Sequence, residues 1–319
     1  GLQLSALSLG SWVTFHKQIE DNTADTLMGM AYDAGINFFD NAEGYAFGES
    51  EKMMGRVLQQ KKWDRTSYTL SSKVFFGWRT NNKPNQTGLS RKHIIEACHE
   101  ALGRLQTDYL DLYFCHRPDQ NVPIEEVVWT MHNLITQGKI LYWGTSQWSA
   151  AEIMEAHRVA DQHHLIGPTV EQPQYNMFER FKMEQDYLPV FKNKGLGTTI
   201  WSPLGAGFLT GKYNDGVPAD SRLSLEGFDW LKERWVQETK IEKVKSLSAL
   251  ASELGMSMAA LAIAWTLKNP HVTTTILGAT KETQLLENLK ALDAQKLLTT
   301  EVMDRIDAIL GNKPFMDLA

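Results

Sequence analysis

The fold is decided by residues 109–146, which read YLDLYFCHRPDQNVPIEEVVWTMHNLITQGKILYWGTS. Two apolar, β-rich runs, 109–116 and 140–146, flank a stretch with helical periodicity from Ile124 to Gln137. Gly138 follows this stretch at the point where a left-handed residue is expected to end a helix. The segment therefore predicts a strand, a helix and a second strand parallel to the first, because parallel strands need a crossover connection.

The same alternation recurs along the chain. The β-rich runs number eight and cover residues 6–12, 36–42, 68–74, 109–116, 140–146, 168–174, 196–204 and 272–280. Further stretches with helical periodicity span Arg91 to Leu105, Ala150 to Ala160 and Lys240 to Leu254, with Asp21, Ser90 and Ser149 as candidate N-caps. This order predicts an α/β protein with a (β/α)₈ barrel of the TIM type. We expect one domain over residues 1–319, because no composition break marks a second one.

A doubly wound sheet is the alternative architecture. Such sheets usually carry Gly-x-Gly-x-x-Gly in the first turn from strand to helix. Here residues 10–15 read GSWVTF, so the expected glycines are missing. The barrel is therefore the better interpretation.

Composition narrows the class of protein. The chain of 319 residues is 43% hydrophobic and 22% charged, with a formal net charge of −6 and no basic stripe, so we expect no nucleic-acid partner. No apolar run is long enough to cross a bilayer, and the first residues have no basic region typical of a signal peptide. The two cysteines have no metal-type spacing, and His163-His164 has no third ligand at a sensible spacing. We expect a cytoplasmic, enzyme-sized protein without a metal site.

Four polar residues follow neighbouring predicted strands. Asp40, Lys73 and His116 end three successive β-rich runs, and Tyr45 lies five residues past Asp40. In a barrel the C-terminal strand ends converge on one mouth, so these side chains can meet. A lysine ammonium close to a tyrosine lowers the pKa of the phenol and makes it a better proton donor to a carbonyl oxygen. Asp40 would hold Lys73, and His116 would orient the carbonyl.

Each of these residues also has an ordinary structural interpretation. An aspartate at a strand end can cap a helix, a tyrosine can be packing, a lysine can be solvated, and a histidine before Arg117-Pro118 can close a turn. Taken singly, these interpretations are favoured. The joint arrangement at successive strand ends favours catalysis instead.

Several aromatic residues also follow the predicted strands, and long polar segments accompany them. Core packing is the usual place for aromatics, but in loops at a barrel mouth they are expected to line an apolar substrate pocket. The segments 77–87 and 214–235 both follow strands and are expected to overhang the same mouth. The predicted substrate pocket comprises Trp12, Tyr45, Phe76, Trp78, His116 and Trp148.

With these motifs the chain resembles the aldo-keto reductases from Leu7 to Asn312. The family pattern Asp-x-x-x-x-Tyr stands at Asp40 to Tyr45, and the family's lysine and histidine resemble Lys73 in LSSKV and His116 in YFCHRPD. The phrases YWGTSQWS and WSPLGAGFLTGKY are similar to the branch that contains the β subunits of voltage-gated potassium channels and their bacterial reductase relatives. The resemblance implies reduction of an aldehyde or ketone with NADPH, with Tyr45 as the general acid.

The resemblance also implies where NADPH binds. Ser146 and Gln172 match the groups that hold the nicotinamide amide, and Trp201 matches the aromatic that stacks on the ring. The residues that resemble the family's pyrophosphate and adenosine contacts are Ser202, Pro203, Leu204, Gly205, Gly207, Lys212, Arg222, Gly278, Thr280, Gln284, Glu287 and Asn288. Trp12 and Asp40 also belong to the predicted cofactor site. Glycines let backbone N–H groups approach phosphates, and a helix beginning near Lys281 would turn its positive end to an anion. NADPH is preferred over NADH.

A second function remains open at this stage. The resemblance to channel subunits implies a homotetramer, and it also allows an NADP(H)-binding regulatory subunit of a membrane channel with little or no turnover. Animal channel subunits typically carry asparagine at the position that resembles His116, whereas free-standing reductases carry histidine. His116 therefore favours the reductase. A barrel lyase or isomerase would leave Trp201 and the segment at Gly278 without a role.

Overall fold

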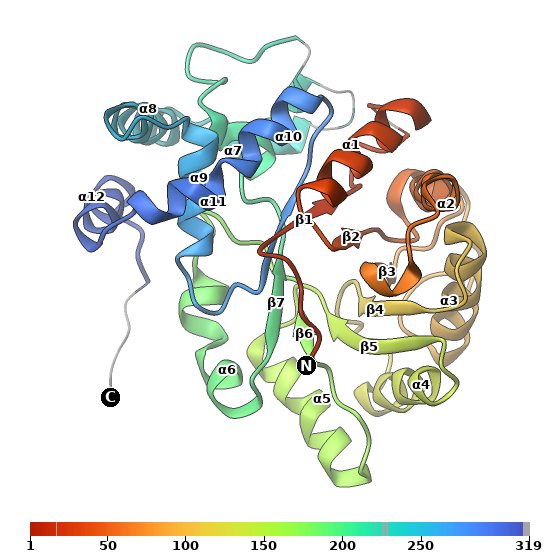
Figure 1. Ribbon diagram of the computed structural model, residues 1–319. Helices are drawn as coiled ribbons and strands as arrows, with labels where there is room; N and C mark the ends of the chain where they lie inside the picture. Colours follow the sequence, from red (N-terminus) through yellow and green to blue (C-terminus); the bar gives the residue numbers. More distant parts are fainter. Residues whose placement is uncertain (17, 220, 225–226, 228, 315–319) are drawn as a thin grey trace.

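The computed structural model describes residues 1–16, 18–219, 221–224, 227 and 229–314, with the side chain of Arg222 also outside the described part. Eight parallel strands form a closed barrel in sequence order, with β1 hydrogen-bonded to β8 (Figure 1). The strands are β1 Leu7–Gly10, β2 Phe38–Asp40, β3 Thr69–Val74, β4 Leu110–Cys115, β5 Ile140–Thr145, β6 Val170–Glu171, β7 Gly197–Ile200 and β8 Thr274–Leu277. Each lies inside one of the predicted β-rich runs, so the (β/α)₈ prediction is confirmed.

Helices surround the strands in Figure 1. They are α1 Asp21–Asp33, α2 Glu49–Lys61, α3 Arg91–Leu105, α4 Ile124–Thr136, α5 Ala150–His163, α6 Leu188–Lys194, α7 Asp229–Trp235, α8 Glu238–Glu253, α9 Met258–Leu267, α10 Glu282–Leu289, α11 Ala291–Ala294 and α12 Thr300–Leu310. The helices predicted from periodicity agree with α3, α4, α5 and α8 to within three residues at either end. No single helix among the described residues has the length and hydropathy to cross a membrane, although α8 and α9 pass that test as a pair bent by 90°.

Local sequence signals set several helix ends. Ser90 caps α3 by accepting a hydrogen bond from the His93 N–H, and Ser149 forms a reciprocal capping box with Glu152 at the start of α5. The predicted cap at Asp21 is wrong: Glu20 holds the N-cap position without a side-chain hydrogen bond, and Asp21 is the first helical residue. Its carboxylate is instead used in an ion pair with Arg56, at 2.6 Å.

Two apolar layers stabilise the barrel. A large cluster fills the space between the strands and the helices. A smaller cluster of Phe38, Leu112, Phe114, Val170 and Ile276 is extended by the partly buried Leu2, Leu4 and Tyr142. Burial of such side chains removes apolar surface from water and contributes roughly 25 cal/mol per Å².

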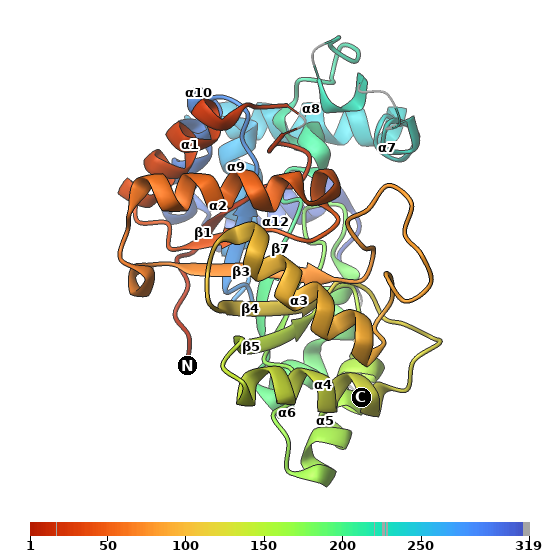
Figure 2. The same ribbon diagram turned by 90° about the vertical axis from the view of Figure 1, so that its right-hand side faces the viewer.

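Strand register brings polar side chains into one row at the C-terminal ends of the strands. Cys115 pairs with Thr145, and Thr145 pairs with Glu171. The next residues, His116, Ser146 and Gln172, therefore leave β4, β5 and β6 at the same level, and each donates its backbone N–H to the neighbouring strand. Gly10 pairs with Asp40 in the same way between β1 and β2. The segment between β3 and α3 projects beyond the end of β3 (Figure 2).

Candidate active site

A cavity of about 890 Å³ opens at the C-terminal ends of the strands. A volume of this size is typical of sites for small molecules and cofactors. The structure brings most of the predicted site residues onto its wall: Trp12, Asp40, Tyr45, Phe76, His116, Ser146, Gln172, Trp201, Ser202, Pro203, Leu204, Gly207, Lys212, Gly278, Thr280, Gln284, Glu287 and Asn288. Lys73 lies behind this wall, fully buried, and reaches it through Asp40 and Tyr45.

Three predicted residues lie elsewhere, and one cannot be placed. Trp78 donates its indole N–H to Glu100 at 2.6 Å, and its ring lies 4.8 Å from the Arg104 guanidinium, outside the cavity. Trp148 is 2% exposed and belongs to the core between strands and helices. Both were predicted in the substrate pocket, and neither lines it, because their side chains turn from the loops toward the helix layer. Gly205 backs onto the ring of Trp235, which a Cβ at 205 would meet at 2.7 Å. The side chain of Arg222 lies outside the described part of the chain.

Lys73 connects the polar residues at the mouth. Its Nζ donates to Asp40 Oδ2 at 2.7 Å, to the Asn41 carbonyl at 2.8 Å and to the Tyr45 phenol oxygen at 3.1 Å. Asp40 Oδ1 accepts from Ser71 at 2.8 Å and from the Gln172 amide at 3.0 Å. All three donors of the ammonium are therefore used, and the side chain is held in one orientation.

Burial and neighbouring charge act in opposite directions on the pKa of Lys73, and also on the pKa of Tyr45. Burial by itself lowers the pKa of Lys73, but the Asp40 carboxylate and Tyr45 raise it above its ordinary value, so the ammonium keeps its proton. Burial raises the pKa of the Tyr45 phenol, and the Lys73 ammonium opposes that rise. The net pKa of Tyr45 is raised. The prediction that Lys73 lowers it holds for the lysine's own contribution, but burial outweighs that contribution.

His116 lies beside the phenol of Tyr45. The two ring centroids are 5.8 Å apart at 72°, and His116 is 7% exposed. Burial, followed by the charges of Lys73 and Arg117, lowers the pKa of His116 well below its ordinary value, so the imidazole is neutral at physiological pH. Its Nδ1 is buried and has no hydrogen-bond partner in the described part of the chain. A neutral imidazole can donate one hydrogen bond to a carbonyl oxygen next to the phenol.

Glu43 ties the Tyr45 loop to the neighbouring loop that carries Phe76. Its Oε1 accepts the backbone N–H of Phe75 at 2.8 Å and that of Gly77 at 2.9 Å. The ring of Phe76 lies 5.1 Å from that of His116. The loop that places Phe76 beside His116 is therefore held by a carboxylate from the same turn as Tyr45.

Hydrogen bonds hold Gln172 and Ser146 in place on the cavity wall. The Gln172 Nε2 donates to Asp40 and to Thr199, at 3.0 and 3.2 Å, which leaves its carbonyl oxygen for a ligand. Ser146 donates to the Gln172 backbone carbonyl at 2.9 Å. A carboxamide on a ligand could pair with these two residues, as a nicotinamide requires.

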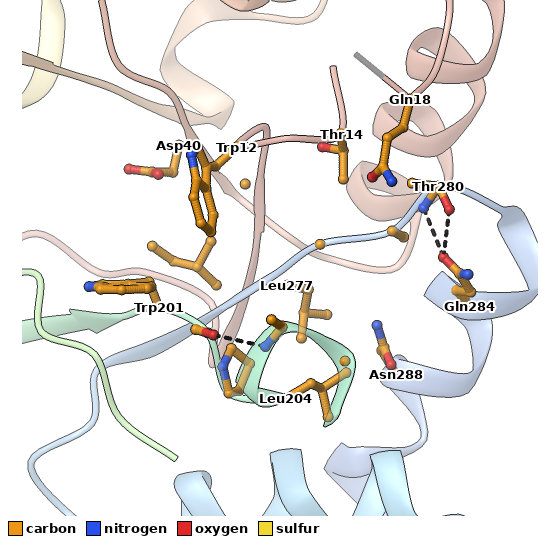
Figure 3. A pocket seen from close by; sticks show the side chains of 18 of the residues that line it. Trp12, Thr14, Gln18, Asp40, Trp201, Leu204, Leu277, Thr280, Gln284 and Asn288 are labelled. Carbon is orange, nitrogen blue, oxygen red and sulfur yellow. Dashed lines mark hydrogen bonds between the residues drawn. The ribbon is translucent and has the colours of Figure 1, made fainter. Parts of the chain in front are cut away.

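Trp201 is held in place by the loop after β5. In the orientation of the Gln147 amide that satisfies both neighbours, its oxygen accepts from the Trp201 indole at 3.0 Å. The Gln147 backbone N–H in turn donates to the buried Glu171 at 2.6 Å. Trp12 meets Trp201 edge to face with 6.2 Å between centroids, and the two rings are seen at one end of the cavity in Figure 3. A flat apolar surface is thus fixed on the cavity wall.

The far end of the cavity has the features of an anion site. Ser202, Gly205, Ala206 and Gly207 have positive φ, which turns the backbone sharply after β7. A Cβ at Gly207 would lie 3.2 Å from the Lys212 side chain, so a glycine lets the turn and this cation approach each other. Across the cavity, Gln284 accepts hydrogen bonds from the backbone and hydroxyl of Thr280, and Asn288 extends from α10 toward Leu204 (Figure 3). Together these groups fit the phosphates and the base of a dinucleotide.

Other residues on the wall were not predicted, or only indirectly. Thr14 and Gln18 come from the loop after β1. The Thr14 hydroxyl is buried without a hydrogen-bond partner among the described residues, which is expected of a group that binds a ligand. Trp230 comes from the segment 214–235, which was expected to overhang the mouth. Arg117 follows His116 directly and lines the cavity, whereas the sequence analysis names it only beside a turn. Its position after a strand end was the available signal.

The structure thus has a closed parallel barrel with Asp40, Tyr45 and His116 on the cavity wall at its mouth and Lys73 directly behind them. The sequence model of the aldo/keto reductase family matches residues 6–311, and the chain belongs to this family.

Two curated relatives cover almost the whole chain. A protein of Oryza sativa subsp. japonica, described as "Probable voltage-gated potassium channel subunit beta", is 50% identical over 98% of this chain and 95% of its own length. A protein of Arabidopsis thaliana with the same description is 48% identical over the same shares. The predicted resemblance to the branch of the channel β subunits is therefore confirmed.

Proposed function

We propose that this protein reduces aldehydes or ketones to alcohols with NADPH, with Tyr45 as the general acid. The observation that carries the proposal is the Lys73 ammonium, 3.1 Å from the Tyr45 phenol and 2.7 Å from Asp40, directly behind the cavity wall. A fixed cation next to a phenol stabilises the charge that the phenol gains as it gives up its proton. Few structural roles require such a group at the mouth of a barrel.

Each residue then has a distinct role. Tyr45 donates its proton to the carbonyl oxygen as negative charge develops there. Lys73 stabilises the resulting phenolate, and Asp40 keeps Lys73 protonated and oriented. His116, neutral because of its burial, donates a hydrogen bond that orients the carbonyl.

In this proposal the cofactor is NADPH, which supplies a hydride to the carbonyl carbon when bound. Gln172 and Ser146 would hold the amide of its nicotinamide, and Trp201 would cover the ring. Lys212 and the turn at Gly207 would bind the pyrophosphate. Thr280, just before α10, and Gln284 on α10 motivate the preference for NADPH over NADH.

A single-turnover experiment tests this function. NADPH bound to the protein is mixed with a panel of aldehydes and ketones, and its oxidation is followed by absorbance or fluorescence. We expect rapid oxidation with at least one carbonyl and loss of the fast phase in Tyr45→Phe, whose NADPH affinity stays close to that of the parent. A rate unchanged by Tyr45→Phe would overturn the assignment of the proton donor.

A second candidate function rests on the two plant relatives, which are described as channel subunits. In this alternative the protein binds NADP(H), turns over slowly or not at all, and regulates a membrane channel. Tight NADPH binding with no oxidation by any carbonyl would favour it. Resemblance to this branch also motivates our proposal of a cytoplasmic homotetramer, which sedimentation velocity of the full chain would test.

A further inference from the structure

Arg117 brings a positive charge to the cavity wall beside the residues proposed to act on the carbonyl. It follows His116 directly and lines the cavity together with Tyr45 and Phe76. Its guanidinium carbon lies 5.6 Å from the centroid of the Phe76 ring. One of its nitrogens, Nη1, donates to the His116 backbone carbonyl and lies 3.5 Å from the Ser146 hydroxyl. These contacts hold Nη1 of the guanidinium in place but do not neutralise the positive charge.

The charge of Arg117 has no carboxylate partner within ion-pair distance in the described part of the chain. Its Nε and Nη2 make no hydrogen bond to any described residue, and neither is among the buried nitrogens that lack a partner. A guanidinium carries five N–H donors in a fixed plane, so a fork of donors stays available. The nearby Glu171 accepts hydrogen bonds from Thr145, Gln147 and Tyr187, and within the described part of the chain it makes none with Arg117.

Other charges near the reacting carbonyl cancel. Lys73 is paired with Asp40, and His116 is neutral. The other cation on the described wall is Lys212, which lies at the Gly207 turn. Burial lowers the pKa of Arg117, while Tyr45 and Glu171 oppose that shift, and the group remains charged at physiological pH. A half-buried cation next to the carbonyl site, without an ion-pair partner among the described residues, attracts an anionic substrate group.

We propose that Arg117 is a substrate-recognition residue that binds a carboxylate, so that the preferred substrates are aldehyde acids or keto acids with the carboxylate a few bonds from the carbonyl. The fork of Nε and Nη2 matches the two oxygens of a carboxylate. One guanidinium balances one monoanion, whereas a phosphate dianion would need a second cation at this place. The inference rests on the proposed reductase function and names its substrate class.

The three isomers of formylbenzoate, each paired with its neutral methyl ester, measure the preference and the spacing. The ratio of kcat/KM between acid and ester is determined for the parent, Arg117→Gln and Arg117→Lys, with Arg91→Gln as a control that removes an exposed arginine of α3. We expect a ratio above about ten for at least one isomer, a fall of tenfold or more in Arg117→Gln that appears mainly in KM, and partial recovery in Arg117→Lys. Arg91→Gln keeps the parental ratio.

A binding measurement keeps the proposal testable without turnover. Tryptophan fluorescence, which Trp12, Trp201 and Trp230 on the wall should make sensitive to ligands, reports binding of benzoate and of neutral benzamide with and without NADP⁺. We expect tighter binding of benzoate in the parent and at least a tenfold loss in Arg117→Gln.

The outcomes separate the two proposals. Acid-to-ester ratios near one for all three isomers, a preference that survives Arg117→Gln, or equal benzoate affinity in parent and variant would each overturn the role of Arg117. Reduction of the esters without any preference for the acids would leave the reductase proposal standing. Benzoate binding that depends on Arg117, without oxidation of NADPH by any compound, would contradict the reductase proposal instead.

Discussion

The ammonium of Lys73 lies 3.1 Å from the phenol oxygen of Tyr45, and no described atom of Lys73 is open to solvent. The Lys73 ammonium stabilises the negative charge that appears when Tyr45 gives up its proton. Lys73 in turn depends on the Asp40 carboxylate to keep its own charge. Fold stability and the proposed catalysis therefore share one buried ion pair.

Removing Lys73 alone should damage both properties. In Lys73→Met the Asp40 carboxylate stays buried without its cation, which costs roughly 3–5 kcal/mol in unfolding free energy for such pairs. The double variant Asp40→Asn/Lys73→Met should regain much of that stability, because neither charge is then left unpaired. Denaturant unfolding measures the difference. Carbonyl reduction should stay low in both variants, and a stable but equally inactive double variant would separate catalysis from folding.

Equal stability of Lys73→Met and the double variant would contradict the coupling of these two side chains.

Neutral His116 should make stability depend on pH in acid solution. Its pKa in the folded protein is lowered well below the value of 6.5 that it has when unfolded, so the unfolded chain binds a proton that the folded protein does not. Its contribution to stability is present above pH 6.5 and is lost as the pH falls below that value. In His116→Asn this part of the pH dependence should vanish, and carbonyl reduction should slow while NADPH affinity changes little. Unfolding curves at several pH values, with Tyr45→Phe as a control that keeps the histidine, measure it.

Glu171 should make stability fall as the pH rises, the opposite of the effect of His116. Burial raises its pKa from 4.5 to about 7, against the hydrogen bond from Thr145 and the charge of Lys182, so the folded protein holds a proton that the unfolded chain has lost. The stabilisation from this protonation is largest at low pH and falls as the pH rises through about 7, by at most about 1.4 kcal/mol per pH unit. Glu171→Gln should remove this slope. A parental slope in Glu171→Gln would show that another group titrates in this range.

Glu43 should control the loop that carries Phe76. Its carboxylate accepts the backbone N–H groups of Phe75 and Gly77, so Glu43→Ala leaves both donors without that partner. We expect faster proteolytic cleavage within residues 77–87 and a higher KM for aromatic carbonyls, with a smaller effect on kcat. Glu49→Ala, which removes a half-buried carboxylate of α2 paired with Lys52, is the control. Cleavage at the parental rate in Glu43→Ala would show that other contacts hold the loop.

Much of the fold could be predicted because each strand is a short apolar run and each predicted helix has one apolar face. The helix α3, with Ser90 as its cap, shows both signals and was predicted from Arg91 to Leu105. The helix α9 is different, because nearly all of its residues are buried and no polar face marks its period. Periodicity alone cannot separate such a segment from a buried strand.

The site was predictable where chemistry follows strand ends and less so where side chains leave loops. Asp40, Lys73 and His116 occupy positions set by strand register, and the structure places them together at the mouth. Trp78 and Trp148 follow strands in sequence, but their loops turn the rings away from the cavity, toward Glu100 and the helix layer. Loop conformation depends on contacts such as those of Glu43, which no local pattern reveals.

Tyr45 as proton donor is tested most directly by single-turnover oxidation of NADPH bound to the 319-residue protein, compared between the parent and Tyr45→Phe with the same carbonyl. We expect a fast phase in the parent and a rate lower by a factor on the order of 10² to 10⁴ in the variant, with NADPH affinity preserved. Equal rates in the two proteins, or no oxidation by any carbonyl in the parent, would contradict it.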